Sequence, residues 1–567
     1  MPARIHRDGE GCGGGLRGEE SGKERNEEYN RRYGLPETTK HALLAVDVIQ
    51  GVPGECPMIM LGTVVCCEVC AYVHGRSDHE PTTWECFMKR VVLLLVDGLR
   101  PDVAEAALGR GELPALAAMT GTRGVQRGIT AFPSTTSVAY LPFLTGCMPG
   151  RCNVPSIRWL DRAAYGGRWW REREAVRSYC GYQAPMLDGD ITPGIQTIFE
   201  LVPESLGLFT PIAKGLTLGR DPARTERKFW GALAHYAEWH QPSDDAVTRH
   251  LLGGIDRGWR FIFAQFPAVD GYTHQSTPDG PKVLRALRKV DATVAAIRER
   301  LRTRHELGDT LILLVSDHGA SVVHSHLDLA TWFRGQGVPT LSHPILWEND
   351  PRAAVMVAGN GSAMVYARPG TPRTERWPLA RLRAPETFGT GHDVIAALTA
   401  EPGVGFVAAE EQPGVVRAAS ADGTADISQV GDRICYQRLS GDPLQLGADL
   451  ALGATEWAES TWDSSYPDAC YQLLDQFRAP RTGDLVVVAN EGIDFRLRYE
   501  VSEHKAGHGS LIRAHMQVPV WASVEAPATP LRTVDLFPAM LNWLGVPVPA
   551  NIDGQPVWTP GRAMAVA

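Results

Sequence analysis

The stretch VVLLLVDG, residues 91–98, constrains the fold more than any other part of the chain. Val91 to Val96 form an unbroken apolar run, which is typical of a strand buried on both faces in a parallel sheet. Asp97-Gly98 follows directly, and such a pair marks the end of a strand. Because parallel sheets build their sites just past the carboxyl ends of strands, Asp97 is a candidate functional residue.

The same pattern returns twice along the chain. Residues 259–266 (WRFIFAQF) predict a second buried strand, and Asp270 lies just beyond it. Residues 310–319 (TLILLVSDHG) predict a third strand that ends at Asp317-His318. Three carboxylates therefore occupy positions that follow strands.

A helix separates the second and third of these strands. Between residues 283 and 301 the apolar positions recur three and four apart, at 283, 287, 290, 294, 297 and 301. This spacing predicts an amphipathic helix, with Gly308 closing it. Strands that alternate with helices predict an α/β fold with a doubly wound, mostly parallel sheet and helices on both faces.

Composition divides the chain into four segments. Residues 1–87 open with a Gly-rich, charged sequence that cannot bury enough apolar surface to fold, so we expect an extension outside the fold. Met88 is a candidate start of translation. Residues 88–330 and 481–567 carry the α/β pattern of a catalytic core. Residues 331–480 are rich in Gly and Pro with short strand-like pieces, which predicts an inserted cap or subdomain.

Charge and hydropathy exclude several classes of protein. The chain is 44% hydrophobic and 21% charged with a net charge of −9, which fits a soluble globular protein with no footprint for nucleic acid. No apolar run reaches the roughly 18 residues of a membrane span. Since the apolar segment 57–73 lacks the flanks of a signal peptide, the sequence predicts a cytoplasmic protein. It gives no indication of the oligomeric state.

A cluster of hydroxyl side chains stands between the first two strands. In AFPSTTSVAY, four consecutive residues from Ser134 to Ser137 carry a hydroxyl and precede a helix-like run. Such a loop either caps the helix or presents a nucleophile, and both roles are compatible. The loop alone does not separate them.

The other candidate residues favour metal chemistry. Three carboxylates (Asp97, Asp270, Asp317) and three imidazoles (His274, His318, His508) accompany the hydroxyl cluster. Each of them alone also fits a turn or a polar loop. Together they suit two divalent ions held by mixed Asp and His ligands, with a hydroxyl as the nucleophile.

The order of these motifs resembles the alkaline phosphatase superfamily, in its type I phosphodiesterase/nucleotide pyrophosphatase branch. The resemblance runs from about Met88 to Val557 and excludes the first 87 residues. It rests on the following motifs, in this order: VVLLLVDGLRPD, FPSTTSVAYLPFLTGCMPG, PAVDGYTH, VSDHGA, GHGS and TVDLFPAMLNWLGVPVPANIDGQPV. One such motif is weak support, but six in the right order are strong support.

The resemblance implies a division of metal ligands. One ion, with zinc as the expected metal, would be held by Asp270, His274 and His508. A second zinc ion would be held by Asp97, Asp317 and His318, with Thr136 against it. By its place in the motif, Thr136 is favoured over Thr135 as the nucleophile. Physically, a bound dication lowers the pKa of a hydroxyl that is barely ionised at neutral pH.

The chain departs from the family pattern at one position. Many nucleotide pyrophosphatases carry an Asn three residues after the nucleophile, and here that residue is Ala139. The contact to a phosphate oxygen must come from elsewhere, and backbone amides at the helix start are one source. No basic residue directly follows Thr136, which favours diesters over monoesters, although three arginines further on remain able to reach back: Arg151, Arg158 and Arg162.

Further polar and aromatic residues have two interpretations each. His324 and His326 fit a solvated loop better than a third metal site. The remaining candidates are either partners of the site or ordinary core and surface residues: Tyr140, Trp159, Asp161, His504 and His515.

The sequence thus predicts a metal-dependent hydrolase of phosphoric esters, acting on the phosphodiester or pyrophosphate bonds of a small molecule with Thr136 as nucleophile. A phosphomonoesterase or a metal-dependent phosphomutase is the alternative within the same class. The alternative from another class is a catalytically silent metal-binding protein on the same scaffold. A full set of ligands plus a hydroxyl argues against the silent protein, which has no physical need for all seven groups.

Overall fold

The computed structural model describes residues 89–166, 175–181, 183–343, 348–371, 373–496, 503–527 and 529–561. The predicted extension 1–87 and the candidate start Met88 lie outside the described residues. Their assignment therefore stays a prediction.

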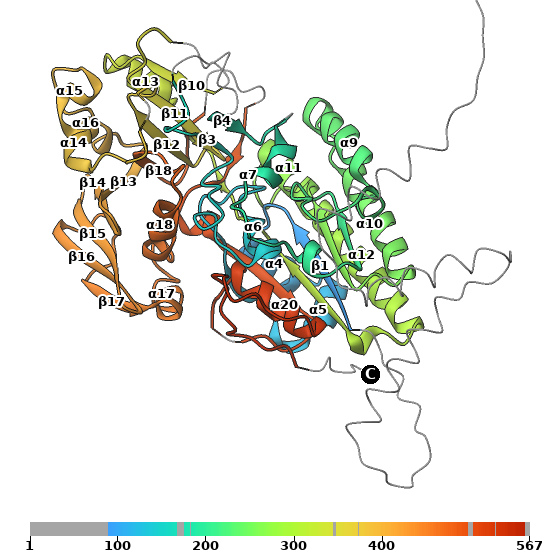
Figure 1. Ribbon diagram of the computed structural model, residues 1–567. Helices are drawn as coiled ribbons and strands as arrows, with labels where there is room; N and C mark the ends of the chain where they lie inside the picture. Colours follow the sequence, from blue (N-terminus) through green and yellow to red (C-terminus); the bar gives the residue numbers. More distant parts are fainter. Residues whose placement is uncertain are drawn as a thin grey trace, which may run out of the picture. The chain divides into compact units, whose positions relative to one another are not determined.

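A seven-stranded sheet forms the centre of the fold (Figure 1), in the order β22-β2-β21-β7-β1-β6-β5. Its strands are β1 (Arg90–Val96), β2 (Gln126–Ile129), β5 (Ser205–Leu208), β6 (Phe261–Phe266), β7 (Thr310–Val315), β21 (Gln517–Ala522) and β22 (Leu531–Arg532). The three predicted strands are adjacent and parallel, with β1 between β6 and β7. Only β21 runs antiparallel to its neighbours β7 and β2, so the prediction of a mostly parallel sheet is confirmed.

Both faces of this sheet are covered, because alternate side chains of β1 enter two different cores. Val91, Leu93 and Leu95 lie in one buried cluster, and the intervening residues of β1 lie in another. The first cluster includes α6 (Leu141–Thr145), α8 (Ile198–Leu201) and α20 (Leu536–Leu544). The second includes α4 (Pro101–Gly109), α5 (Pro114–Thr120), α10 (Gln241–Asp256) and α12 (Pro281–Thr303). The doubly wound α/β architecture is therefore confirmed.

Helix α12 is the predicted amphipathic helix, and all six predicted apolar positions on it are buried. Its end differs from the prediction. The helix stops at Thr303, where the backbone N–H of Arg304 bonds to carbonyls of the last turn, and Gly308 lies in the following 3-10 helix Leu307–Asp309. Gly308 is therefore not the cap.

A second sheet of nine strands is built largely from the segment predicted as an insertion, in the order β10-β11-β12-β18-β13-β14-β15-β16-β17. Its strands are β10 (Thr340–Ser342), β11 (Ala353–Ala358), β12 (Ser362–Ala367), β13 (Val404–Gln412), β14 (Val415–Ser420), β15 (Gly423–Val430), β16 (Arg433–Gly441), β17 (Leu450–Gly453) and β18 (Leu485–Ala489). Strand β18 pairs antiparallel with β12 and β13, so the second sheet continues past the predicted boundary at residue 480. A short run of buried Val residues fits an antiparallel strand as well as a parallel one, which is why the sequence pattern does not separate the two.

Helices also cover the second sheet, and one face of it reaches the hydroxyl-rich loop. One core holds α13 (Leu329–Gly335), α14 (Leu379–Arg383), α15 (Pro385–Phe388) and α16 (Val394–Thr399). The opposite core holds α17 (Ala454–Ser460) and α18 (Ala469–Arg478), and it includes Ile129 and Phe132 from the start of that loop. Within the described ranges, no helix combines the length and apolar character that crossing a membrane requires.

Candidate active site

The carboxyl ends of three adjacent strands bring the predicted carboxylates together. Asp97 follows β1, Asp317 follows β7, and Asp270 lies on α11 (Ala268–Gln275) directly after β6. Gly98 makes this approach possible, because its φ is +71° and a Cβ there would lie 2.8 Å from Asp270 Oδ1. The Gly98 N–H also points to Asp317 Oδ1 at 3.3 Å.

Thr136 and Thr135 occupy different surroundings although they are neighbours in the chain. The Thr136 Oγ1 lies 3.3 Å from Asp97 Oδ1 and 3.2 Å from His318 Nε2. The Thr135 Oγ1 is buried and has no hydrogen-bond partner in the described part of the chain, and its methyl group lies against Gly359. Of these two hydroxyls, only that of Thr136 is therefore in contact with the Asp/His cluster.

The helix that follows this loop begins after Ala139, the position where many family members carry Asn. Helix α6 begins at Leu141, and the Ala139 N–H donates to the Thr135 carbonyl at 2.9 Å. The amide at the position of the missing Asn is thus already used within the loop.

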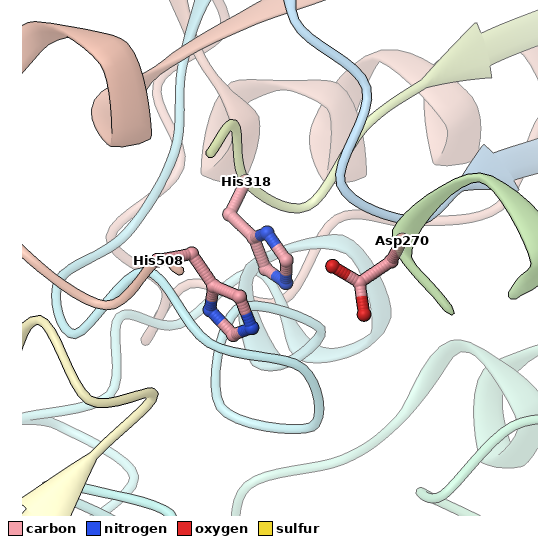
Figure 2. A group of neighbouring side chains, drawn as sticks. All are labelled: Asp270, His318 and His508. Atoms are coloured by element: carbon pink, nitrogen blue, oxygen red, sulfur yellow. The ribbon is translucent and has the colours of Figure 1, made fainter. Parts of the chain in front are cut away.

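His508 reaches the cluster from a separate segment. It follows β20 (Ala506–Gly507), which pairs with β8 (Ser321–Val322), and its ring stacks on that of His318 with centroids 3.7 Å apart. Figure 2 shows these two rings side by side, with the Asp270 carboxylate facing the ring of His318. The potential ligand atoms form two groups, and within each group they all lie within 4.8 Å of one another. One group is Asp270, His318 and His508, and the other is Asp97, Asp317 and His318.

The imidazoles are held in one tautomer by the backbone. The Nδ1 atoms of His274, His318 and His508 lie 2.8, 3.0 and 3.0 Å from the carbonyls of Ala506, Gly319 and Ser134. Because a carbonyl only accepts, each Nδ1 carries a proton, and Nε2 is the ring nitrogen that faces the cluster. His274 Nε2 lies 3.2 Å from Asp270 Oδ2. This orientation is the one that metal-binding histidines adopt.

Burial and crowded charge perturb the titration of the cluster. Burial raises the pKa of Asp97 well above its usual range, and it raises the pKa of Asp317 to about 8, with neighbouring carboxylates adding to both effects. Burial alone would raise the pKa of Asp270, but His274 and His508 lower it below its usual range. Burial opposes protonation of His274, yet Asp270 raises its pKa to about 9.

The Asp/His cluster has buried carboxylate oxygens that a bound cation would satisfy. Asp270 Oδ1 and Asp317 Oδ2 are buried without a hydrogen-bond partner among the described residues. Burying carboxylates in this way is costly unless they are paired or bind a metal. Mixed carboxylate and imidazole donors suit zinc and related divalent ions. The residues present can therefore hold metal.

The sequence did not identify Gln265 as a residue of the site, and it left two interpretations open for Tyr140. Gln265 donates to Asp97 Oδ2 at 2.7 Å, and the buried Tyr140 donates to the same oxygen at 3.2 Å. A polar Gln inside the apolar run FIFAQF is a signal that was available. For Tyr140, core packing and a role in the site both hold.

Most of the remaining candidates lie outside the cluster. The Trp159 indole donates to the Tyr179 hydroxyl in the core, and Asp161 accepts backbone N–H groups of its own loop. His515 is buried and bonds to Ser321 Oγ at 2.9 Å, whereas His324 and His326 are exposed. The ring of His504 stacks on that of His274, with centroids 4.2 Å apart.

The three arginines that follow the nucleophile loop make contacts of their own. Arg151 pairs with Asp553 at 2.8 Å, Arg158 donates to the Val357 carbonyl, and Arg162 donates to the carbonyls of Pro480 and Thr482.

A doubly wound α/β fold with buried Asp and His ligands and a hydroxyl at the carboxyl edge defines a class of metal-dependent phosphoester hydrolases. Residues 91–511 match the family described as type I phosphodiesterase/nucleotide pyrophosphatase. The chain belongs to this family, and the resemblance predicted from its motifs is confirmed.

Curated relatives match over shorter stretches. The human GPI ethanolamine phosphate transferase 2 catalytic subunit is 24% identical over 259 residues, which is 44% of this chain and 23% of that protein. The mouse GPI ethanolamine phosphate transferase 3 catalytic subunit is 30% identical over 84 residues, 15% of this chain and 7% of that protein. The chain thus spans less than a quarter of the length of these relatives.

Solved structures resemble the fold at low identity. Phosphonoacetate hydrolase from Sinorhizobium meliloti 1021 aligns with a TM-score of 0.48 and 14% identity, covering 81% of this chain and 96% of that one. Human ectonucleotide pyrophosphatase/phosphodiesterase 5 aligns with a TM-score of 0.48 and 12% identity, covering 82% and 97%.

Proposed function

We propose that this protein hydrolyses phosphodiester bonds of small molecules, with Thr136 as the nucleophile and two divalent ions, zinc by preference, as cofactors. The observation that carries the proposal is the position of the Thr136 hydroxyl, 3.3 Å from Asp97 Oδ1 and 3.2 Å from His318 Nε2. Asp97 and His318 belong to one group of three potential ligands, and His318 also belongs to the other. The hydroxyl therefore lies where ligands of both groups meet.

The ligands would divide as the family resemblance implies. Asp97, Asp317 and His318 would hold one ion, as their grouping supports. Asp270 and His508 would hold the other together with His274, whose Nε2 lies 3.2 Å from Asp270 Oδ2, although the group of ligand atoms around Asp270 and His508 contains His318 and not His274. Such ions lower the pKa of a coordinated hydroxyl and stabilise negative charge on phosphate oxygens. Gln265 and Tyr140 would hold the Asp97 carboxylate in place through its second oxygen.

The chemistry of Thr136 would proceed in two displacements. Its oxygen attacks phosphorus in line with the leaving group, so an O–P bond to threonine forms as the bond to the leaving arm breaks. Water then attacks the phosphothreonine, which releases the phosphomonoester and restores the hydroxyl. The β-methyl group of Thr136 limits its χ1 rotamers and keeps the oxygen directed at the cluster.

Arg227 is our candidate for the phosphate contact that Ala139 does not supply. It is half-buried on α9 (Arg224–Ala237), and its Nη1 has no hydrogen-bond partner among the residues described. Burial lowers the pKa of Arg227, and Asp221, Asp188 and Tyr140, the last of which bonds Asp97, oppose that shift. Arg227 nevertheless keeps its positive charge, because an arginine side chain is not deprotonated in proteins.

A single positively charged side chain at the phosphate, that of Arg227, favours a diester substrate over a monoester. A diester carries one negative charge and needs one donor for the non-bridging oxygen that faces away from the metals, whereas a monoester carries nearly two charges and a further oxygen. The test compares kcat/KM for bis-p-nitrophenyl phosphate and p-nitrophenyl phosphate at equal metal loading. We expect the diester to be preferred; a clear preference for the monoester would support a phosphomonoesterase instead.

The proposed location is the cytoplasm. Among the described residues, the cysteines at 147, 152, 180, 435 and 470 form no disulfide with one another, which fits a reducing compartment. Fractionation of cells that express the full chain tests this, and recovery of the protein in a membrane or secreted fraction would contradict it.

A further inference from the structure

Helix α11 carries Asp270 and His274, and residues at and just before the start of α10 contact it near its beginning, its middle and its end. At the first residue of α11, the Ala268 N–H donates to Asp244 Oδ1 at 3.1 Å. Asp244 is buried on α10, so its carboxylate satisfies one of the backbone donors that a helix start leaves open. This contact fixes the amino end of α11 two residues before Asp270.

The middle of α11 approaches His240, the residue that precedes α10, without any intervening side chain. A Cβ at Gly271 would lie 2.1 Å from His240 Nδ1, far inside van der Waals contact. The His240 ring also meets the ring of Tyr272 edge to face, with centroids 5.1 Å apart. The absence of a side chain at Gly271 therefore sets how closely α11 and His240 pack.

The carboxyl end of α11 meets the same imidazole. His240 Nε2 lies 2.9 Å from the side-chain nitrogen of Gln275, the last residue of the helix. Since His240 touches residues 271, 272 and 275, a single ring contacts the helix on both sides of His274. Each of these contacts restrains the rotation of α11 about its axis, which aims Asp270 and His274.

We propose that His240 is a positioning residue for the metal centre, which through its close contact with Gly271 holds α11 in the rotation that presents Asp270 and His274 to one ion. The proposal rests on the proposed function, in that it takes these two residues as ligands. Metal ligands need to be held to within about 0.5 Å, and the loss of supporting contacts costs about 10- to 100-fold in metal affinity.

A double-mutant cycle tests the contact. Gly271→Ala introduces the methyl group that collides with His240, and His240→Ala removes the ring. Zinc affinity, measured by competition with a chromophoric chelator on the full chain, is expected to fall about 10- to 100-fold in Gly271→Ala and by less in His240→Ala. The double variant should bind as His240→Ala does, because the collision is gone.

Gly253→Ala is the matched control. Gly253 is also helical, on α10, but a Cβ there would meet nothing closer than the end of Arg257 at 3.6 Å, so zinc affinity should not change. Wild-type affinity in Gly271→Ala, or a double variant that binds no better than Gly271→Ala, would overturn the proposal. If Gly271→Ala fails to fold, the double variant decides: it must fold and bind as His240→Ala does, and failure to do so also overturns it.

Asp270→Ala separates this inference from the proposed function. If Asp270→Ala keeps the zinc affinity of the wild type, the ligand assignment itself is wrong. If Asp270→Ala loses zinc while Gly271→Ala does not, the ligands stand and only the role of His240 falls.

Discussion

Thr136 and its neighbour Thr135 offer the same hydroxyl in opposite settings, which makes them a matched pair. Thr136→Ala should lower kcat by at least about 1,000-fold at unchanged fold, because it removes the nucleophile. Thr136→Ser should retain a measurable part of the activity, since a hydroxyl remains. The Thr135 hydroxyl is buried without a partner among the described residues. Thr135→Ala should therefore stay active, and the reverse outcome in steady-state assays would move the role by one residue.

Replacement of Arg227 tests its proposed contact with the phosphate. Arg227→Ala should lower kcat/KM for a diester about 100-fold, the usual effect of removing one oxyanion donor, while zinc content stays the same. Added guanidinium ions should restore part of the activity. Arg224→Ala, an exposed arginine on the same helix, is the control and should behave as wild type. An Arg227→Ala enzyme with unchanged kcat/KM would show that this side chain does not touch the phosphate.

The residues that sequence reasoning found and missed differ in what determines them. Asp97, Asp270 and Asp317 each follow an apolar strand, so a local pattern marks them. Gln265 and Tyr140 donate hydrogen bonds to Asp97, although they are 168 and 43 residues away from it in the sequence. No local pattern encodes such a contact, because it exists only once β1, β6 and the nucleophile loop pack together.

Apolar runs located the strands, but they did not give the direction of each strand. Buried apolar runs predicted β1, β6 and β7 correctly. The same kind of run forms β18 in the second sheet and the antiparallel β21 at the centre, because burial on both faces does not encode direction. The rotation that we propose for α11 likewise depends on a contact between Gly271 and His240, which no pattern within the helix reveals.

Two elements that carry histidines give a prediction on metal content. His274 lies on α11 and His318 follows β7, and the family resemblance assigns them to different ions. His274→Ala and His318→Ala should each remove about one ion per chain and nearly all turnover. Elemental analysis of the purified variants measures this, and full metal content in both would contradict the assignment.

For the whole molecule, the cluster couples stability to pH. Without metal, the pKa of Asp317 is about 8 against an ordinary 3.8, and that of His274 is about 9 against 6.5. Between pH 6.5 and 8 the folded chain therefore holds more protons at these groups than the unfolded chain, so they make the free energy of unfolding fall as pH rises.

Bound metal should remove this dependence, because its ligands are already deprotonated. The increase in Tm on adding zinc should therefore widen from pH 6.5 to 8. Calorimetry of metal-free and zinc-loaded protein across this range tests the expectation. An increase that stays constant or narrows would contradict it.

The central claim is that phosphodiester hydrolysis depends on two metal ions bound at the Asp/His cluster. The most direct measurement removes metal with a chelator and follows hydrolysis of bis-p-nitrophenyl phosphate as zinc is returned, with bound zinc counted by elemental analysis. We expect no turnover in the metal-free protein and full turnover at two zinc ions per chain. Undiminished hydrolysis by the metal-free protein, or no hydrolysis with both ions bound, would contradict it.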